Sequence, residues 1–194
     1  MIIGLTGQTG AGKSTVCDFL REKGLLVIDC DKVARSVTEK GTKTLDLLAD
    51  AFGSDIIFED GSLNRRELAS RAFQTDEKTE LLNSITHPAI TDAINKVISE
   101  HKTEDIILDA PTLIESGVYK LCDKIVSVLA DAKVRKERII ARDSLTPSEA
   151  EKRMSAQKDD SFYKEYSVAV IYNNGNKAET IERAEQIFSE IGVL

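Results

Sequence analysis

The sequence predicts an α/β fold of three layers, in which helices lie on both faces of a parallel β-sheet. Two patterns support this prediction. Short apolar segments that end at glycine or at polar residues indicate buried strands at residues 2–6, 25–28, 105–109, 124–129 and 168–172. Helical patterns separate these segments, and an alternation of strands and helices is typical of a parallel sheet.

The first half of the chain contains the start of the sheet and a long helical insertion. A helical pattern over residues 13 to about 23 links the first two strands and carries its apolar residues on one face. Residues 32–101 are then mostly helical, with interruptions at Gly53 and at Asp60-Gly61, where we expect a turn that closes a small hairpin or loop. This stretch is too long for a simple crossover, so it predicts a helical substrate lobe inserted into the α/β domain.

The second half completes the sheet and adds charged helices. Residues 131–143 and 147–157 are charged helical stretches, and Thr146-Pro147 has the composition of a capped start for the second one. An amphipathic helix at 177–191 closes the domain. We therefore expect one domain over residues 1–194, divided into a core at about 1–31, 104–135 and 166–194, a substrate lobe at about 32–103, and a helical lid at about 136–165.

Composition limits the classes of protein. The 194 residues carry 33 acidic and 26 basic side chains, and no apolar run approaches the roughly 18 residues of a membrane-spanning helix. No basic stretch precedes the apolar segment Met1–Gly7, so we expect no secretion signal and a cytoplasmic location. A net charge of −7 argues against broad nucleic-acid binding, and three cysteines without C-x-x-C spacing indicate reduced thiols. The expected partner is a small-molecule substrate, and the expected assembly is a monomer or small homo-oligomer.

A phosphate-binding motif joins the first predicted strand to the first predicted helix. The segment Gly7-Gln8-Thr9-Gly10-Ala11-Gly12-Lys13-Ser14 satisfies G-x-x-x-x-G-K-[ST] in full. Glycines allow several backbone N–H groups to point at one phosphate, and the helix N-terminus adds its positive dipole end. We expect Lys13 to bridge the β- and γ-phosphates of ATP and the Ser14 hydroxyl to bind Mg²⁺, as in P-loop NTPases. The expected ATP-binding residues of this segment are Gly7, Thr9, Gly10, Ala11, Gly12, Lys13, Ser14 and Thr15.

Aspartates follow two of the predicted strands. Asp29-Cys30-Asp31 ends the second strand, at the edge where open α/β sheets bind ligands. An aspartate there is suited to accept the proton of a hydroxyl that attacks the γ-phosphate, as a kinase requires. The alternative is that the pair only caps a helix starting near Lys32. Asp109 ends the third strand and is a weaker signal of a group that holds Mg²⁺ directly or through water.

Arginines and one histidine add further candidates. Arg138 and Arg142 are four residues apart and share a helix face that is suited to close over a triphosphate as a lid. A solvated helix face with Glu137 as the partner is the alternative. His87-Pro88 by itself predicts a turn or a helix cap.

Short motifs follow one another along nearly the whole chain in the order found in one family. The phosphate-binding loop is followed by Val27–Arg35, Phe52-Gly53, Asp60-Gly61, Leu63–Arg65, His87-Pro88, Asp109, Pro111–Glu115, Arg138–Asp143, Arg153–Gln157 and Ile171–Gly175. In this order the chain resembles the dephospho-CoA kinases of the P-loop kinase superfamily. It departs from their usual pattern at Asn64, Thr112, Ile114, Ser167–Ala169 and Tyr172.

The resemblance implies transfer of the γ-phosphate of ATP to the ribose 3′-hydroxyl of dephospho-CoA, which gives CoA and ADP and uses Mg²⁺. It also implies that Asp31 is the catalytic base and that Lys13 and Arg138 complete the catalytic set. By the same resemblance, the helical lobe contacts the substrate, together with Asp31, Arg35, His87 and Leu113. The resemblance further implies that Arg138 and Arg142 belong to the lid over ATP and that the loop from Asn173 to Gly175 lies near adenine.

Two other functions share parts of this pattern. A nucleoside-monophosphate or small-metabolite kinase has the same loop, lid and α/β core. An ATP-binding switch or partner-dependent ATPase hydrolyses ATP without a small acceptor. The long helical insertion favours a substrate lobe, and therefore a kinase, over a switch.

Overall fold

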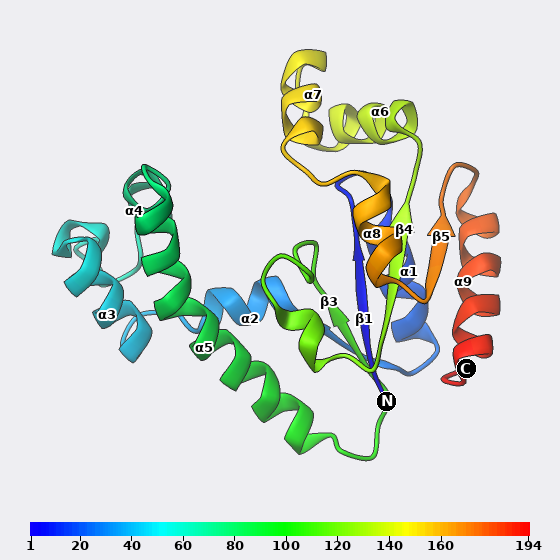
Figure 1. Ribbon diagram of the computed structural model, residues 1–194, viewed down its shortest axis with the longest axis horizontal. Coiled ribbons are helices and arrows are strands. Elements are labelled where there is room, and N and C mark those ends of the chain that lie inside the picture. The colour runs from blue at the N-terminus through cyan, green and yellow to red at the C-terminus, as the bar shows by residue number, and fades with distance from the viewer. The chain divides into compact units, whose positions relative to one another are not determined.

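The computed structural model describes residues 1–194, and the chain divides into two compact units. The core unit comprises Met1–Asp29 and Thr103–Leu194, and the helical unit comprises Cys30–Lys102. All the strands of the sheet lie in the core unit, whereas the helical unit contains helices α2 to α5 (Figure 1). None of the helices combines the length and the apolar composition that spanning a lipid bilayer requires.

A five-stranded parallel sheet forms the centre of the core unit. Its order is β2-β3-β1-β4-β5, and all four neighbouring pairs are parallel, which confirms the predicted α/β class. The central strand β1 places Leu5 beside Asp109 of β3 and Gly7 beside Val128 of β4. The loop after β1 therefore leaves the carboxyl edge of the sheet between two neighbours, which is where such sheets bind ligands. The strands are β1 (Ile2–Gly7), β2 (Leu26–Asp29), β3 (Ile106–Asp109), β4 (Lys124–Leu129) and β5 (Ala169–Tyr172).

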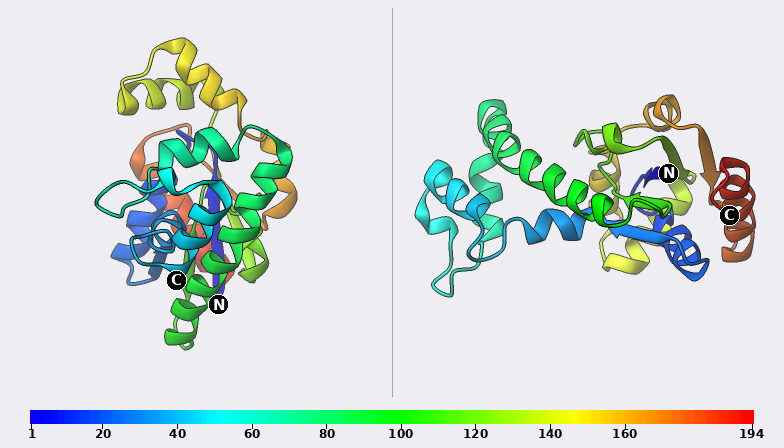
Figure 2. Two further views of the ribbon diagram at one scale, coloured as in Figure 1. Left: turned by 90° about the vertical axis from the view of Figure 1, so that its left-hand side faces the viewer. Right: turned by 90° about the horizontal axis from the view of Figure 1, so that it is seen from below.

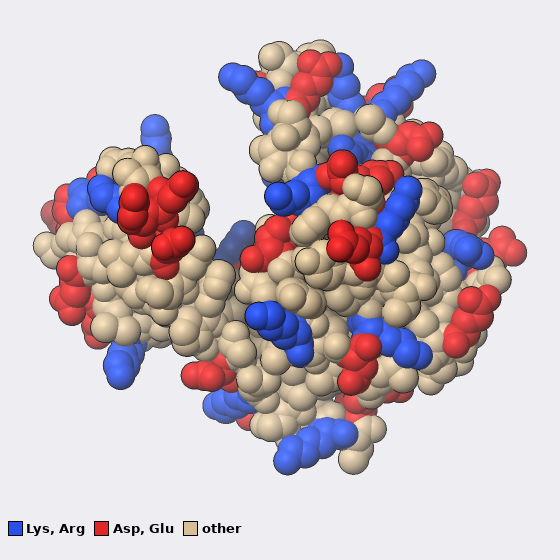
Figure 3. Space-filling model, viewed as in Figure 1, with Lys and Arg blue, Asp and Glu red and all other residues tan.

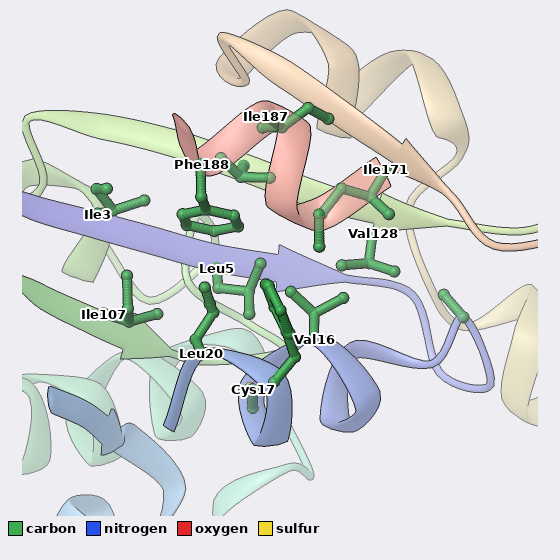
Figure 4. Packing of buried hydrophobic residues seen from close by; sticks show 14 of the residues in the cluster. Ile3, Leu5, Val16, Cys17, Leu20, Ile107, Val128, Ile171, Ile187 and Phe188 are labelled. Carbon is green, nitrogen blue, oxygen red and sulfur yellow. The ribbon is translucent and has the colours of Figure 1, made fainter. Parts of the chain in front are cut away.

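Helices cover both faces of this sheet. On one face, α1 (Lys13–Glu22) and α9 (Lys177–Ile191) pack their apolar residues onto β1, as Leu20 and Phe188 do against Leu5 in Figure 4. Each such fully buried side chain stabilises the fold by roughly 1.5–3 kcal/mol. On the other face, α8 (Asp160–Tyr166) and η2 (Val118–Leu121) accompany a second cluster around Ile114, Leu129 and Tyr163. Successive strand residues alternate between the two clusters, because side chains of a strand point to opposite faces.

The segment between β4 and β5 contains α6 (Ala132–Asp143), α7 (Pro147–Ser155) and α8. The start of α7 has the predicted cap: Thr146 Oγ1 accepts from the Glu149 N–H, and the Glu149 carboxylate accepts from the Thr146 N–H. Helix α8 was not predicted, because it has seven residues and buries only Tyr163, so it shows no apolar periodicity. Its N-terminus is fixed instead by Asp159, which accepts from the Phe162 N–H.

The helical unit has its own small core. This core consists of Leu48, Phe52, Ile56, Leu68 and Ala72. The predicted turn at Asp60-Gly61 is present: Phe58 N–H donates to the Ser62 carbonyl at 2.8 Å, and Ile57 pairs with Leu63 in an antiparallel bridge. The elements of the unit are α2 (Cys30–Ser36), α3 (Lys43–Phe52), η1 (Ser54–Ile56), α4 (Arg65–Ala72) and α5 (Asp76–Glu100).

Two local predictions in this unit need correction. The turn or cap predicted at His87-Pro88 is wrong, because α5 runs through both residues as one helix of 25 residues (Figure 2). Pro88 removes one backbone donor from the helix, but this local loss is smaller than the gain from continuing a long helix that Thr75 caps at its start. Helix α2 begins at Cys30, slightly before the predicted start near Lys32, so that Asp31 lies in its first turn.

Candidate active site

The loop between β1 and α1 has a backbone that only glycine tolerates at several positions. Gly10 and Gly12 have φ values of 77° and 92°, in the left-handed region where side chains cause strain. A Cβ atom on Gly12 would lie 2.0 Å from Asn173 Nδ2, and one on Gly7 would lie 2.1 Å from the Val128 carbonyl oxygen. Both glycines of the motif are therefore required by contacts with β4 and with the end of β5, as well as by backbone conformation.

Lys13 is held by a carboxylate of the neighbouring strand. Its Nζ forms an ion pair with Asp109 Oδ1, and the two side chains are only 17% and 14% exposed. Asp109 is the register partner of Asp29 across β2 and β3, so both aspartates lie at the carboxyl edge of the sheet. Cys17 follows Lys13 by one helical turn, and burial, with a further contribution from Asp109, raises the pKa of its thiol to about 12. The thiol is therefore protonated at neutral pH and part of the core.

The Asn173 side chain links the loop to α6 and to α9. Its Nδ2 donates to the Ala11 carbonyl at 2.8 Å. Its Oδ1 accepts from Arg138 Nη2 at 3.1 Å and from the Thr180 hydroxyl at 2.7 Å. The Asn173 backbone carbonyl accepts a further bond from Arg138 Nη1 at 2.9 Å. Because Asn173 is only 5% exposed, these bonds are largely sheltered from water and fix the side chain in one orientation.

Arg138 and Arg142, the two arginines predicted to close over ATP, have different environments. Arg138 reaches the phosphate loop, where its Nη1 lies 3.5 Å from the Gly10 carbonyl oxygen in addition to its bonds with Asn173. Arg142 instead forms two hydrogen bonds with its neighbour Asp143, which also accepts from Arg153 Nη1 at 2.7 Å. The hydrogen bonds from Arg142 hold the pKa of the Asp143 carboxyl below its ordinary value. Basic and acidic side chains alternate around α6 and α7 at the top of Figure 3.

Two site contacts were not found by sequence reasoning. The Thr9 N–H donates to Gln157 Oε1 at 2.9 Å, and Gln8 Nε2 donates to the Lys158 carbonyl at 3.0 Å. Both bonds tie the phosphate loop to the segment that follows α7. Gln157 belongs to a motif of the family resemblance, but no local pattern in the sequence showed that it contacts the loop.

A cavity opens beside the phosphate loop, on the side of β5 and α9. Its volume is about 170 Å³. Thr15 and the loop from Asn173 onward were expected to contact ATP, whereas Lys177 and Thr180 were not singled out. The cavity is lined by Gly12, Thr15, Arg138, Asn173, Lys177 and Thr180.

The other predicted site residues are distributed over both units. In the core unit, Ser14 is exposed in the first turn of α1, Gly175 is exposed in the loop before α9, and Leu113 is fully buried next to Gly4. In the helical unit, Asp31 lies in the first turn of α2 and Arg35 in its last turn, where the Arg35 carbonyl accepts from Arg65 Nη2 at 3.3 Å. His87 lies in the middle of α5.

Comparison with known proteins gives one consistent result. The profile of the dephospho-CoA kinase family matches residues 1–179. The dephospho-CoA kinase of Corynebacterium glutamicum is 38% identical over 192 residues, which cover 97% of this chain and 96% of that protein. A crystal structure of a Thermus thermophilus protein aligns with a TM-score of 0.85 at 30% identity, over 98% of this chain and 97% of that one. A dephospho-CoA kinase from Campylobacter jejuni shares the fold, with a TM-score of 0.72 at 22% identity over 98% and 96% of the two chains.

Proposed function

The chain belongs to the dephospho-CoA kinase family, and we propose that it transfers the γ-phosphate of ATP to the ribose 3′-hydroxyl of dephospho-CoA. The products are CoA and ADP. Membership of this family makes the protein an ATP-dependent kinase that acts on a hydroxyl group. The observation that carries the proposal is the complete phosphate loop with Lys13 beside Asp109, in a chain that matches the family over nearly its full length.

The phosphate loop and Lys13 bind the triphosphate. Backbone N–H groups of the loop and the N-terminus of α1 supply positive partial charge, and Lys13 neutralises the β- and γ-phosphate oxygens. Lys13 is already paired with Asp109, so ATP binding exchanges a carboxylate partner for phosphate partners. The expected contacts of the triphosphate run from Gly7 to Thr15.

The residues around Lys13 fit a magnesium ion that arrives with ATP. Mg²⁺ keeps several waters and takes phosphate oxygens plus one or two protein oxygens, so it needs no cage of side chains. The exposed Ser14 hydroxyl and the Asp109 carboxylate at the neighbouring strand end are oxygen donors of this kind. In the proposal Ser14 binds the ion directly and Asp109 acts directly or through water. The ion would neutralise charge on the transferring phosphoryl group.

The acceptor side of the reaction is assigned to the helical unit and the lid. Asp31, two residues beyond the end of β2, orients the 3′-hydroxyl of the acceptor and accepts its proton. Arg35 and His87 contact the CoA moiety in this assignment. Leu113 is fully buried, so in the proposal it supports the core unit from within and does not itself contact the substrate. Arg138 and Arg142 of the lid, residues 136–165, shield the phosphoryl group from water. We further propose that the enzyme acts in the cytoplasm as a monomer or small homo-oligomer.

The direct test is a phosphotransfer assay. The purified protein is incubated with Mg·ATP and dephospho-CoA, and ADP and CoA are quantified. Two parallel controls contain AMP in place of dephospho-CoA, or no acceptor at all. CoA should appear with dephospho-CoA, and ADP should form in equal amount. Phosphorylation of AMP instead would identify a nucleoside-monophosphate kinase, and ADP without any acceptor would identify an ATPase.

The proposed base is tested by Asp31→Asn, with Asp50→Asn on the exposed face of α3 as a matched control. Asp31→Asn should lower kcat by about 10²–10⁴-fold, which is the usual contribution of a positioned base, and leave the ATP dissociation constant nearly unchanged. Asp50→Asn should change neither. If Asp31→Asn retained most of the activity, the proton acceptor would be Asp29 or water instead of Asp31.

A further inference from the structure

The cavity beside the phosphate loop contains few groups that are free to recognise a ligand. If ATP is bound by the loop, as proposed above, this open cavity beside the loop is a place for the base. A cavity of about 150 Å³ holds a benzene-sized ring, so about 170 Å³ that opens to solvent accommodates one ring system rather than a whole nucleoside. The question is which of its polar side chains distinguish one base from another.

Arg138 provides a flat surface in the cavity. One edge of its guanidinium is held by Asn173, through Nη1 to the backbone carbonyl and through Nη2 to Oδ1. Because Nη1 and Nη2 each donate to Asn173, the plane of the guanidinium is fixed, and arginine faces stack on aromatic rings. Stacking of this kind has little preference among bases, because every base has a π-face.

Asn173 and Thr180 are occupied by the protein itself. Asn173 uses Nδ2 for the Ala11 carbonyl and Oδ1 for Arg138 and Thr180, and a Cβ on Gly12 would lie only 2.0 Å from Nδ2. The Thr180 hydroxyl hydrogen is directed at Asn173 Oδ1 or at the Asn176 carbonyl. The hydrogen bonds above hold these two buried side chains in place, and one N–H of Asn173 Nδ2 remains as a donor that, like an ammonium group, pairs only with an acceptor on a base.

Lys177 is the remaining charged group of the lining. It is the first residue of α9, it is exposed, and it forms no ion pair or side-chain hydrogen bond. An ammonium group is a donor only. Guanine presents two adjacent acceptors, N7 and O6, whereas adenine presents N7 beside the donor N6 amino group. A donor-only side chain therefore matches guanine, or hypoxanthine, better than adenine.

We propose that Lys177 reads the six-position edge of the base and that this cavity admits guanine and hypoxanthine as well as adenine. GTP and ITP then act as phosphate donors besides ATP. The chemistry is unchanged: the bond from the γ-phosphorus to the β–γ bridging oxygen breaks, a bond to the acceptor 3′-oxygen forms, and the hydroxyl proton passes to Asp31. The nucleoside diphosphate leaves as GDP or IDP.

The test compares ATP, GTP and ITP as donors to dephospho-CoA, by kcat/KM, for the wild type and for Lys177→Ala and Lys177→Gln. A side chain that donates to both N7 and O6 favours guanine over another base by about tenfold or more. Lys177→Ala should therefore lower the ratio of kcat/KM for GTP to kcat/KM for ATP by about tenfold. Lys177→Gln carries an amide that matches N6 and N7 of adenine, and should lower that ratio further. Arg183 is an exposed basic residue on the same helix that donates a hydrogen bond to Gln186, and Arg183→Ala is the control that should leave the ratio unchanged.

Calorimetric dissociation constants for ADP and GDP provide a second measurement that does not depend on turnover. They should change in the same direction as the kinetic ratio. Wild-type protein that uses ATP but neither GTP nor ITP would overturn the inference and leave the proposed function intact, as would equal ratios in all variants. Absence of CoA formation with ATP would instead overturn the proposed function.

Discussion

Replacement of Gly10 by alanine tests how closely the phosphate loop packs against α6. Gly10 is not one of the glycines that the motif requires, yet its φ is 77° and a Cβ there would lie 2.8 Å from the Arg135 carbonyl oxygen and 3.0 Å from Ile139 Cγ1. The left-handed conformation costs an alanine roughly 1–2 kcal/mol, and the forced shift of α6 adds about 1–3 kcal/mol, as other overpacked sites do. We expect a total loss of about 2–5 kcal/mol in the free energy of unfolding.

Gly24→Ala is the matched control for this experiment. Gly24 has a φ of 87°, but a Cβ there meets nothing within 4 Å, so only the conformational cost applies. Any effect of alanine on the unfolded chain is shared by both variants and cancels in their difference. In a domain of this size 1 kcal/mol changes Tm by about 2–4 °C. By calorimetry, Gly24→Ala should therefore lower Tm by about 4 °C and Gly10→Ala by about 10 °C.

The two variants should also differ in catalysis. A shift of α6 moves Arg138 with it, so Gly10→Ala should raise the KM for ATP by about tenfold, whereas Gly24→Ala should leave it unchanged. Equal losses of Tm in the two variants would refute the reasoning, because they would show that the contact with Arg135 carries no cost. An unchanged KM for ATP in Gly10→Ala would show that the packing of α6 against the loop does not affect nucleotide binding.

Two further predictions concern Asn173 and Asp143. Asn173→Ala leaves the Ala11 carbonyl without its side-chain donor and removes the Oδ1 acceptor shared by Arg138 and Thr180, so the free energy of unfolding should fall by about 2–4 kcal/mol in chemical denaturation, with Asn95→Ala on the exposed face of α5 as the control. Asp143 has its pKa lowered from 3.8 in the folded protein, chiefly by hydrogen bonds from Arg142. A carboxyl group whose pKa is lower in the folded than in the unfolded protein stabilises the fold at pH values above its unfolded pKa. This stabilisation is lost as the pH falls through its folded pKa. The Tm of Asp143→Asn should therefore lie below that of wild type at pH 6, and the two should converge as the pH falls below 3.8; a constant difference would contradict this.

The fold was predictable because its signals are local. Five apolar segments marked the strands, and Gly7 and Gly12 marked a loop whose backbone conformation only glycine adopts without strain. Local signals failed at two helices. Helix α8 has too few residues for periodicity, and α5 continues through Pro88, where the residue type predicts an interruption.

The residues that support the loop were less predictable, because each lies far away in the sequence. Asp109 is 96 residues from Lys13, Gln157 is 148 residues from Thr9, and Asn173 is 162 residues from Ala11. The sequence predicted chemistry for Asp109 and a position near adenine for Asn173. It gave no sign that either residue holds the phosphate loop, because that depends on the order of the strands and not on any local pattern.

The hydrogen bond from Asn173 to Ala11 determines the direction in which the Gly12 N–H of the phosphate loop points. The Ala11 carbonyl and the Gly12 N–H belong to one planar trans peptide and point in opposite directions. By accepting from Asn173 Nδ2, the carbonyl keeps the Gly12 N–H directed away from Asn173, so this peptide cannot reverse without breaking a buried hydrogen bond. Donors fixed before substrate arrives need no reorganisation during the reaction. The same amide holds Arg138 over the cavity, so one side chain couples phosphate binding to base binding. Loss of Asn173 should therefore reduce the use of ATP and GTP alike, whereas loss of Lys177 should change only the preference between them.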